Sequence, residues 1–244
     1  MKLLKQILES VASKTFSVRR CSFENIVGNV DTKLILNKAI LSRKPVHVLL
    51  VGKPSCAKTM FLTEIMYSIK KSYFTVGSNT TKSGLVNQLF EKEPKYLLID
   101  ELDKMSGNDQ VSLLHLMETG LISETKVKKT RQLELVSWVF ATANNYEKII
   151  EPLLSRFLVI EVPDYTFEEF MEISVVRLAK EKIDKHTAEV IAENLWSEGS
   201  RDIRDVIKVA RLANNAQEVS FIIKMMKRYP SPDKKTDSGF GVGN

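Results

Sequence analysis

The stretch that decides the fold is Val46-His47-Val48-Leu49-Leu50-Val51-Gly52-Lys53-Pro54-Ser55-Cys56-Ala57-Lys58-Thr59. A short apolar run leads into a Gly, a loop of small residues and a Lys-Thr pair. The apolar run is typical of a buried parallel strand. Backbone N–H groups at a helix N-terminus are unpaired and the macrodipole is positive there, so a loop that opens a helix can bind an anion. The stretch therefore predicts a strand, a phosphate-binding loop and a helix.

The loop matches the pattern G-x-x-x-x-G-K-[ST] except at Ala57, which replaces the second Gly. In that pattern the Lys reaches the β- and γ-phosphates and the hydroxyl ligates Mg²⁺, roles that would fall to Lys58 and Thr59. The methyl group of Ala57 is tolerable if the residue has already entered the right-handed helical region, which we expect. The alternative is an ordinary strand-to-helix turn. The residues predicted to bind the nucleotide here are Gly52, Lys53, Pro54, Ser55, Cys56, Ala57, Lys58, Thr59 and Met60.

A second apolar run, Tyr96-Leu97-Leu98-Ile99, ends in Asp100 and Glu101. Buried carboxylates are costly unless they are paired, so two acids at the end of a buried strand need a reason. Beside a phosphate-binding loop, Asp100 can hold Mg²⁺ and Glu101 can orient and deprotonate the attacking water. Taken alone, the pair would be better interpreted as solvated acids at a strand end or a helix cap, but not beside the Lys58–Thr59 loop.

Two further motifs follow in order along the chain. The run 138–143 predicts another buried strand, and Asn144 stands at its end, where an amide could contact a γ-phosphate or the lytic water. Arg156 ends a short helix and leads into the strand 158–162. Individually, Asn144 would be a turn residue and Arg156 a surface cation.

Together the four motifs resemble the AAA+ ATPase core, with its Walker A, Walker B, sensor 1 and arginine-finger motifs. The resemblance implies an α/β fold, in which a P-loop core with a central parallel β-sheet flanked by helices carries a small all-α lid domain. It also implies ATP or ADP and Mg²⁺ as cofactors. The finger, Arg156, would act in trans on a neighbouring subunit's nucleotide by stabilising charge on the transferring phosphoryl group. The protein would then be a homo-oligomeric ring, a hexamer.

The resemblance extends to both sides of these motifs. Upstream, the segment 22–28 is similar to the AAA+ segment that packs on the adenine, which implies base contacts from Ile26 and Val27. Downstream, the segment 199–204 resembles the sensor 2 motif at the start of a lid helix. Arg201 aligns with the sensor and Arg204 is the fallback, whereas a solvated or salt-bridged helix start is the alternative for both.

Composition and helix-capping patterns predict the domains. The chain has 244 residues, of which 43% are hydrophobic, enough for one α/β core and a smaller helical domain. We expect a helical segment over 1–21, the AAA+ core over 22–163, a helical lid over 164–229 and a disordered tail over 230–244. Thr166 and Glu169 form a capping-box pattern for the first lid helix, and further helices are expected near 186–197, 201–215 and 217–228.

Cysteine usage and hydropathy favour a cytoplasmic protein. The two cysteines, Cys21 and Cys56, give no disulfide or ligand framework. No apolar stretch approaches the roughly 18 residues needed to span a bilayer, and we expect no membrane partner. The formal charge of +6 permits a polyanionic partner without demanding one.

Residues 121–135 resemble a hairpin that some AAA+ branches, among them RuvB, MCM helicases, MoxR proteins and unfoldases, insert before sensor 1. Its tip concentrates four basic residues with no acid between them: Lys126, Lys128, Lys129 and Arg131. Basic hairpins in a ring's channel can follow a phosphate backbone, which makes these four residues candidates for nucleic-acid contacts. A solvated hairpin turn is the alternative.

The details resemble different branches. Ala57-Lys58-Thr59 and the residues around Asp100 are similar to MCM and MoxR motifs, but the short segment between the Walker motifs leaves no room for those groups' extra helix. The compact layout and Ser155-Arg156-Phe157 resemble the RuvB branch-migration motors, although the winged-helix domain expected in RuvB has no space here. Without that domain, the specificity for DNA junctions stays open, and a partner protein could supply specificity.

The expected function is an ATP-hydrolysing, ring-forming AAA+ motor that acts on DNA as a translocase or helicase core. One alternative is an ATP-dependent protein remodeller of the MoxR or unfoldase kind, although no clear aromatic channel loop favours it. The other is a nucleotide-gated scaffold, against which intact Glu101 and Arg156 argue.

Overall fold

The computed structural model of the protein describes residues 20–126, 129–213 and 215–229, and of residues 125, 126, 129, 216 and 217 it describes the backbone only. Within these residues the chain forms two compact units. The first, the sheet unit, contains 20–24, 30–51 and 58–161. The second, the helical unit, contains 25–29, 52–57 and 162–229.

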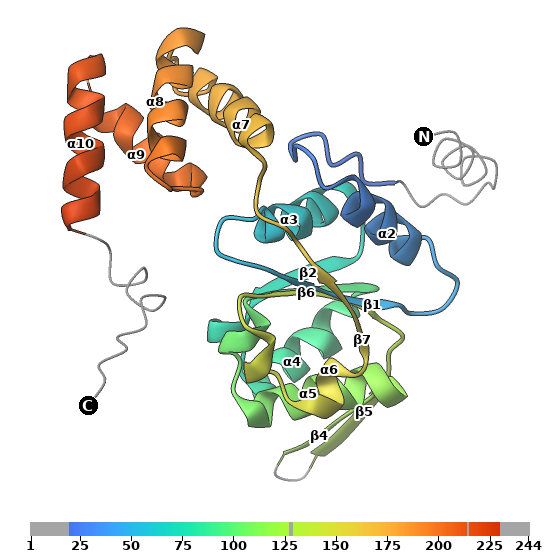
Figure 1. Cartoon of the computed structure of the whole chain (residues 1–244). Helices are drawn as coiled ribbons and strands as arrows, with labels where there is room; N and C mark the ends of the chain where they lie inside the picture. Colours follow the sequence, from blue (N-terminus) through green and yellow to red (C-terminus); the bar gives the residue numbers. More distant parts are fainter. Residues whose placement is uncertain (1–19, 127–128, 214, 230–244) are drawn as a thin grey trace, which may run out of the picture. The chain divides into compact units, whose positions relative to one another are not determined.

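The sheet unit is built on a parallel sheet with the strand order β2-β3-β6-β1-β7 (Figure 1). Its strands are β1 His47–Val51, β2 Ser72–Val76, β3 Tyr96–Asp100, β6 Trp138–Ala143 and β7 Phe157–Glu161. All four neighbouring pairs are parallel. The predicted α/β fold with a central parallel sheet is therefore confirmed.

Helices cover both faces of this sheet (Figure 1). On one face lie α2 Val30–Ile40 and α3 Lys58–Ser68, and on the other lie α4 Lys82–Lys92, α5 Gly107–Thr119 and α6 Glu151–Leu154. Short 3₁₀ turns occupy Gly77–Asn79 (η1), Leu102–Lys104 (η2) and Tyr146–Lys148 (η3).

The two central strands β3 and β6 are buried along their whole length. Cover on both faces excludes water from the strands, which explains why they read as continuous apolar runs and not as alternating ones. Within β6, Thr142 is the polar exception, and it is 1% exposed. A buried hydroxyl at this position needs hydrogen-bond partners, and they lie at the end of β3.

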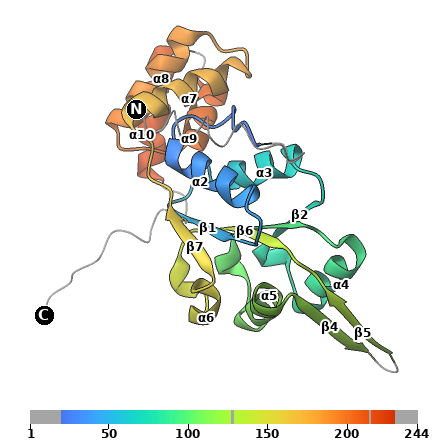
Figure 2. The same cartoon turned by 90° about the vertical axis from the view of Figure 1, so that its right-hand side faces the viewer.

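An antiparallel hairpin stands between α5 and β6, as predicted. It consists of β4 Leu121–Lys126 and β5 Lys129–Glu134, and it extends away from the parallel sheet (Figure 2). In its register Glu124 pairs with Arg131 and Lys126 with Lys129. Residues 127 and 128, which include the candidate Lys128, lie outside the described residues.

The helical unit contains α7 Phe167–Ala179, α8 Lys185–Ser197, α9 Ile203–Leu212 and α10 Ala216–Arg228. The predicted capping box at the start of α7 is present, because Thr166 accepts from Glu169 N and the Glu169 carboxylate accepts from Thr166 N. Helix α9 is shorter than expected at both ends. Asp202 is its N-cap, so the helix starts at Ile203 and not at residue 201.

Three expectations concern the ends of the chain and membranes. The helical segment expected over 1–21 lies outside the described residues except for residues 20 and 21, and the tail expected over 230–244 lies outside them entirely. In the part of the chain that the structure describes, no helix has both the length and the apolar character needed to cross a membrane.

Candidate nucleotide site

The carboxyl ends of β1, β3 and β6 meet at one edge of the sheet, because β6 pairs in parallel with both β1 and β3. In open α/β sheets, ligands bind outside this edge. The residues that follow β3 and β6 there are Glu101 and Asn144, and the last residue of β3 is Asp100. Two separately predicted motifs are thus brought to the same place.

Thr59 and Asp100 are in direct contact. The Thr59 Oγ1 hydroxyl lies 3.0 Å and 2.9 Å from the two carboxylate oxygens of Asp100, to which it donates. Thr59 is the second residue of α3, and the preceding Lys58, which opens the helix, is 7% exposed. The hydroxyl and the carboxylate predicted to share a metal ion therefore lie within hydrogen-bonding distance of one another.

This donor set fits Mg²⁺. A hydroxyl and a carboxylate are hard oxygen ligands, and Mg²⁺ is usually held by one or two carboxylates with substrate phosphates and water completing the shell. Thr59 and Asp100 would hold the ion, and Lys58 at the start of α3 would face the phosphates.

The loop 52–57, which belongs to the helical unit, has two residues in the left-handed region: Ser55 at φ 74° and Ala57 at φ 58°. The expectation that Ala57 would be right-handed is therefore wrong. Helix α3 begins one residue later, at Lys58, so Ala57 keeps the conformation for which the motif's Gly is suited. A left-handed L-residue costs roughly 1–2 kcal/mol.

Lys53 is bound to a residue that sequence reasoning did not find. Its Nζ donates to Asp164 Oδ2 at 2.8 Å, and Cys56 Sγ lies 3.4 Å from Asp164 Oδ1. The hydrogen bond from Lys53 is the main cause that lowers the pKa of Asp164, with a smaller contribution from the charge of Arg201. In the sequence, Asp164 was notable only as part of the pair Pro163-Asp164, which follows the last predicted strand of the core.

Glu101 has an unusual backbone. Its φ of 52° and ψ of 50° are left-handed, and its N–H donates to Thr142 Oγ1 at 2.9 Å. A Cβ added to Gly77 would lie 2.2 Å from the Glu101 carbonyl oxygen, so only Gly fits there. Sequence reasoning missed both neighbours. The one available signal for Thr142 was a polar residue inside an apolar run.

Asn144 and Arg156 do not join Thr59 and Asp100 through any described contact. Asn144 is exposed at the end of β6. Arg156, between α6 and β7, donates to Glu118 of α5 at 2.5 Å, and both side chains are over 40% exposed. The phosphate-sensing role of Asn144 and the trans role of Arg156 remain predictions.

Both sensor 2 candidates are engaged inside the helical unit. Arg201 Nη1 donates to the carbonyl oxygens of Trp196 at 2.8 Å and Ser200 at 3.0 Å, and its guanidinium carbon lies 3.4 Å from the Trp196 ring centroid. Arg204 pairs with Asp202, the N-cap of α9. The salt-bridged helix start that was the alternative thus describes Arg204.

The predicted adenine contacts differ in burial. Ile26 is 3% exposed, Val27 is half-buried, and Met60, at the end of the predicted loop set, is 42% exposed. Gly28 follows with φ 64°, and a Cβ there would overlap the Glu169 carboxylate, so this segment packs against the start of α7. Base contact by Ile26 and Val27 stays a prediction.

The hairpin candidates divide into two groups. The structure describes no side chain for Lys126, Lys128 or Lys129. The Arg131 guanidinium forms an ion pair with Glu124 and lies 4.7 Å from the Phe90 ring centroid of α4. Its charge is therefore already balanced within the hairpin, and its contact with a phosphate stays a prediction.

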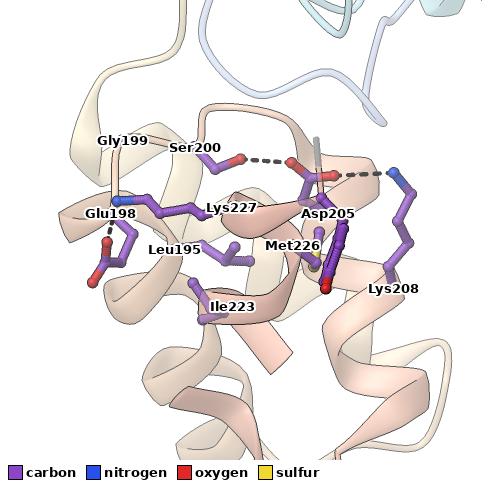
Figure 3. A pocket seen from close by; sticks show the side chains of 10 residues that line it. Leu195, Glu198, Gly199, Ser200, Asp205, Lys208, Ile223, Met226 and Lys227 are labelled. Carbon is purple, nitrogen blue, oxygen red and sulfur yellow. Dashed lines mark hydrogen bonds and ion pairs between the residues drawn. The ribbon is translucent and has the colours of Figure 1, made fainter. Parts of the chain in front are cut away.

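A separate cavity of about 400 Å³ lies between α8, α9 and α10 (Figure 3). Its apolar side is formed by Leu195, Ile223 and Met226. At its polar side Asp205, 2% exposed, accepts from Ser200 at 2.8 Å and from Lys208 at 3.0 Å. The residues predicted to bind nucleotide do not line this cavity.

Known proteins are similar to this chain in sequence and in structure. Residues 48–165 match the family model described as ATPase family associated with various cellular activities (AAA). The DNA replication licensing factor MCM6 of Oryza sativa subsp. indica is 27% identical over 214 residues, 72% of this chain and 25% of the relative. The Lon protease of Clostridium acetobutylicum is 28% identical over 183 residues, 63% of this chain and 23% of that protein.

Solved structures of Thermotoga maritima RuvB have the same fold. The structure described as the RuvB Holliday junction branch migration motor is 20% identical, with a TM-score of 0.62 over 86% of this chain and 72% of that one. A RuvB mutant reaches a TM-score of 0.66, at 20% identity and with 86% and 74% coverage. The chain spans about a quarter of the length of the curated relatives named above. Residues 48–165 of the chain are thus similar in sequence to the AAA family of ATPases.

Proposed function

We propose that this protein hydrolyses ATP and uses the energy as a ring-forming motor on DNA. The observation that carries the first half is the Thr59–Asp100 contact at the start of α3, because it joins the two motifs that a P-loop ATPase needs at one point. The family supports the same chemistry.

Each residue of the site then has one task. Lys58 holds the β- and γ-phosphates, Thr59 and Asp100 hold Mg²⁺, and Glu101 orients the attacking water and accepts its proton. When bound, Mg²⁺ would neutralise charge that develops on the phosphate oxygens. Asn144 would contact the γ-phosphate or the water, and Arg156 would reach the nucleotide of a neighbouring copy.

The DNA half rests on the hairpin and the relatives. Licensing factors and a branch-migration motor are, by their names, proteins of DNA. The hairpin β4–β5 places Lys126 and Lys129 directly opposite one another at its end. A cationic tip can neutralise backbone phosphates without reading sequence. A hexameric ring and a partner that selects the DNA structure are part of this proposal.

A second candidate function is ATP-dependent remodelling of proteins. The similarity to a Lon protease favours it. ATP turnover measured with single-stranded, duplex and four-way-junction DNA, and separately with unfolded casein, distinguishes the two. Stimulation by any of the DNAs supports the DNA motor, and stimulation by casein alone supports the remodeller.

The proposed base has its own test. Glu101→Gln keeps the size of the side chain and one acceptor oxygen but removes the carboxylate that would accept the proton. The variant should bind ATP normally and hydrolyse it at least about 100-fold more slowly, since a positioned base contributes 10²–10⁴. Wild-type turnover by Glu101→Gln would remove this residue from the mechanism.

A further inference from the structure

Thr142 carries a buried hydroxyl next to the two consecutive acidic residues of the site, Asp100 and Glu101. It is 1% exposed and lies in β6 opposite Leu50 of β1. Its Oγ1 lies 2.6 Å from Asp100 Oδ1 and 2.9 Å from the Glu101 backbone nitrogen. One hydroxyl thus contacts both consecutive acids, Asp100 through its carboxylate and Glu101 through its backbone N–H.

The chemistry fixes the direction of both hydrogen bonds. A backbone N–H can only donate, so the hydroxyl accepts from Glu101. The hydroxyl has one hydrogen, and that hydrogen is left for the carboxylate of Asp100. Loss of the hydroxyl would take this acceptor away from the Glu101 N–H, and a polar group without a partner is costly in a protein interior. The Glu101 amide therefore donates to Thr142, and Thr142 in turn donates to Asp100.

The two bonds do different work. Asp100 already accepts from Thr59 through both carboxylate oxygens, so it keeps a partner without Thr142. The Glu101 amide has Thr142 as its acceptor, and Glu101 adopts φ 52° and ψ 50°. Because this left-handed conformation is unfavourable for an L-residue, it persists only where the surrounding structure stabilises it.

We propose that Thr142 is a positioning residue for ATP hydrolysis, which fixes the backbone of the base Glu101 relative to the metal ligand Asp100. This inference rests on the proposed hydrolysis of ATP. Thr142 touches no substrate in this role and acts through its two neighbours. A displacement of about 1 Å at a reacting group can cost roughly 100-fold in rate, so the loss of this hold should be visible in turnover.

The test compares Thr142→Val, which keeps the shape, with Thr142→Ser, which keeps the hydroxyl. Ser137→Ala is the matched control, since Ser137 is 5% exposed and donates to Pro94 O at 2.6 Å just before β6 begins, at the other end of the strand. We expect Thr142→Val to lower kcat by about 10- to 100-fold and to raise the Mg²⁺ concentration that gives half-maximal rate. ATP affinity should stay within about threefold, and Thr142→Ser should recover most of the rate.

A double variant shows whether the effect passes through the base. If Thr142 acts by positioning Glu101, Thr142→Val should add little to the loss already caused by Glu101→Gln. If Thr142→Val does not fold, Thr142→Cys replaces it, because a thiol of similar size is a weak donor and acceptor.

Three results would count against the inference. Wild-type kcat and Mg²⁺ dependence in folded Thr142→Val overturn it, and so do equal losses in Thr142→Val and Ser137→Ala. If the wild-type protein does not hydrolyse ATP under any condition, the proposed function itself falls and the role of Thr142 falls with it.

Discussion

Thr59 Oγ1 and the Asp100 carboxylate lie 2.9 Å and 3.0 Å apart although 41 positions separate them in the chain. The contact exists because the helix that follows β1 and the end of β3 meet at the same edge of the sheet. It places the two proposed Mg²⁺ ligands beside Lys58. The consequences for nucleotide binding can be tested on two lysines of the same segment.

Lys58→Ala should abolish ATP binding, because Lys58 is the cation that reaches the β- and γ-phosphates in this motif. Lys53→Ala is the comparison within the same predicted loop: it removes the same charge, but the Lys53 side chain is 74% exposed and already donates to Asp164. We expect titration calorimetry to show no binding for the first variant and at most a few-fold change for the second. Unchanged ATP affinity in folded Lys58→Ala would exclude the proposed phosphate contact.

Ala57→Gly should stabilise the protein. At φ 58° an alanine is strained, and glycine removes the strain at a smaller cost in the entropy of the unfolded chain. The net gain should be up to about 1 kcal/mol in the free energy of unfolding. Ala210→Gly, inside α9, is the control and should lose about 1 kcal/mol. Chemical denaturation of both variants measures the difference, and a loss at both positions would contradict the strain at Ala57.

The sequence predicted what depends on local pattern. Apolar runs gave the central strands, and the residues at their ends gave Asp100 and Glu101, because parallel strands bring their carboxyl ends to one edge. The left-handed Ala57 escaped prediction because one residue's φ depends on where the following helix starts. Thr142 and Asp164 escaped because each binds a residue far away in the chain, through a contact that no spacing rule describes.

Arg156 lies next to Glu118 within its own chain. If Arg156 serves a neighbouring subunit's nucleotide, Arg156→Ala should lose hydrolysis and keep ATP binding. Mixing Arg156→Ala with Lys58→Ala protein should then restore part of the activity, because some interfaces combine an intact Lys58 site with an intact Arg156. Glu118→Gln is the control, since it removes the charge that pairs with Arg156 but leaves the Arg156 side chain in place. A monomeric protein that hydrolyses ATP at a specific rate independent of protein concentration would refute a shared site.

His47 makes stability depend on pH. Burial lowers its pKa to about 4 from the ordinary 6.5, and its Nδ1 accepts from Val139 N at 3.1 Å. Between these two values the unfolded chain binds the proton and the folded protein does not, so stability falls as the pH drops below 6.5. From pH 7 to pH 5 the loss should be about 2 kcal/mol.

Urea denaturation at the two pH values measures this loss. His47→Asn is the comparison, because its amide oxygen can accept from Val139 N without titrating. The difference between wild type and variant should shrink as the pH falls. Identical pH dependence in both proteins would show that His47 is not the group responsible.

The hairpin decides between the DNA and protein functions. If Lys126, Lys128 and Lys129 neutralise phosphates, their replacement by Ser should weaken binding to all DNA sequences alike, because phosphate contacts carry no base information. The slope of log affinity against log salt should become shallower by about 0.7–0.9 for each phosphate that the variant no longer neutralises. Basal ATP hydrolysis should survive, whereas stimulation by DNA should disappear. Arg131→Ser should have a smaller effect on the slope, since Glu124 already balances its charge.

An equal change of charge elsewhere provides the control for this experiment. Serine at Lys180, Lys182 and Lys185, three exposed lysines between and at the ends of α7 and α8, removes the same three charges from the helical unit. Fluorescence anisotropy should show a loss of DNA binding for the hairpin variant that far exceeds the loss for this one. Equal losses would mean that net charge alone attracts DNA. If the ATP-loaded Glu101→Gln protein shows no salt-dependent DNA binding even at low ionic strength, the DNA-motor proposal falls and protein remodelling takes its place.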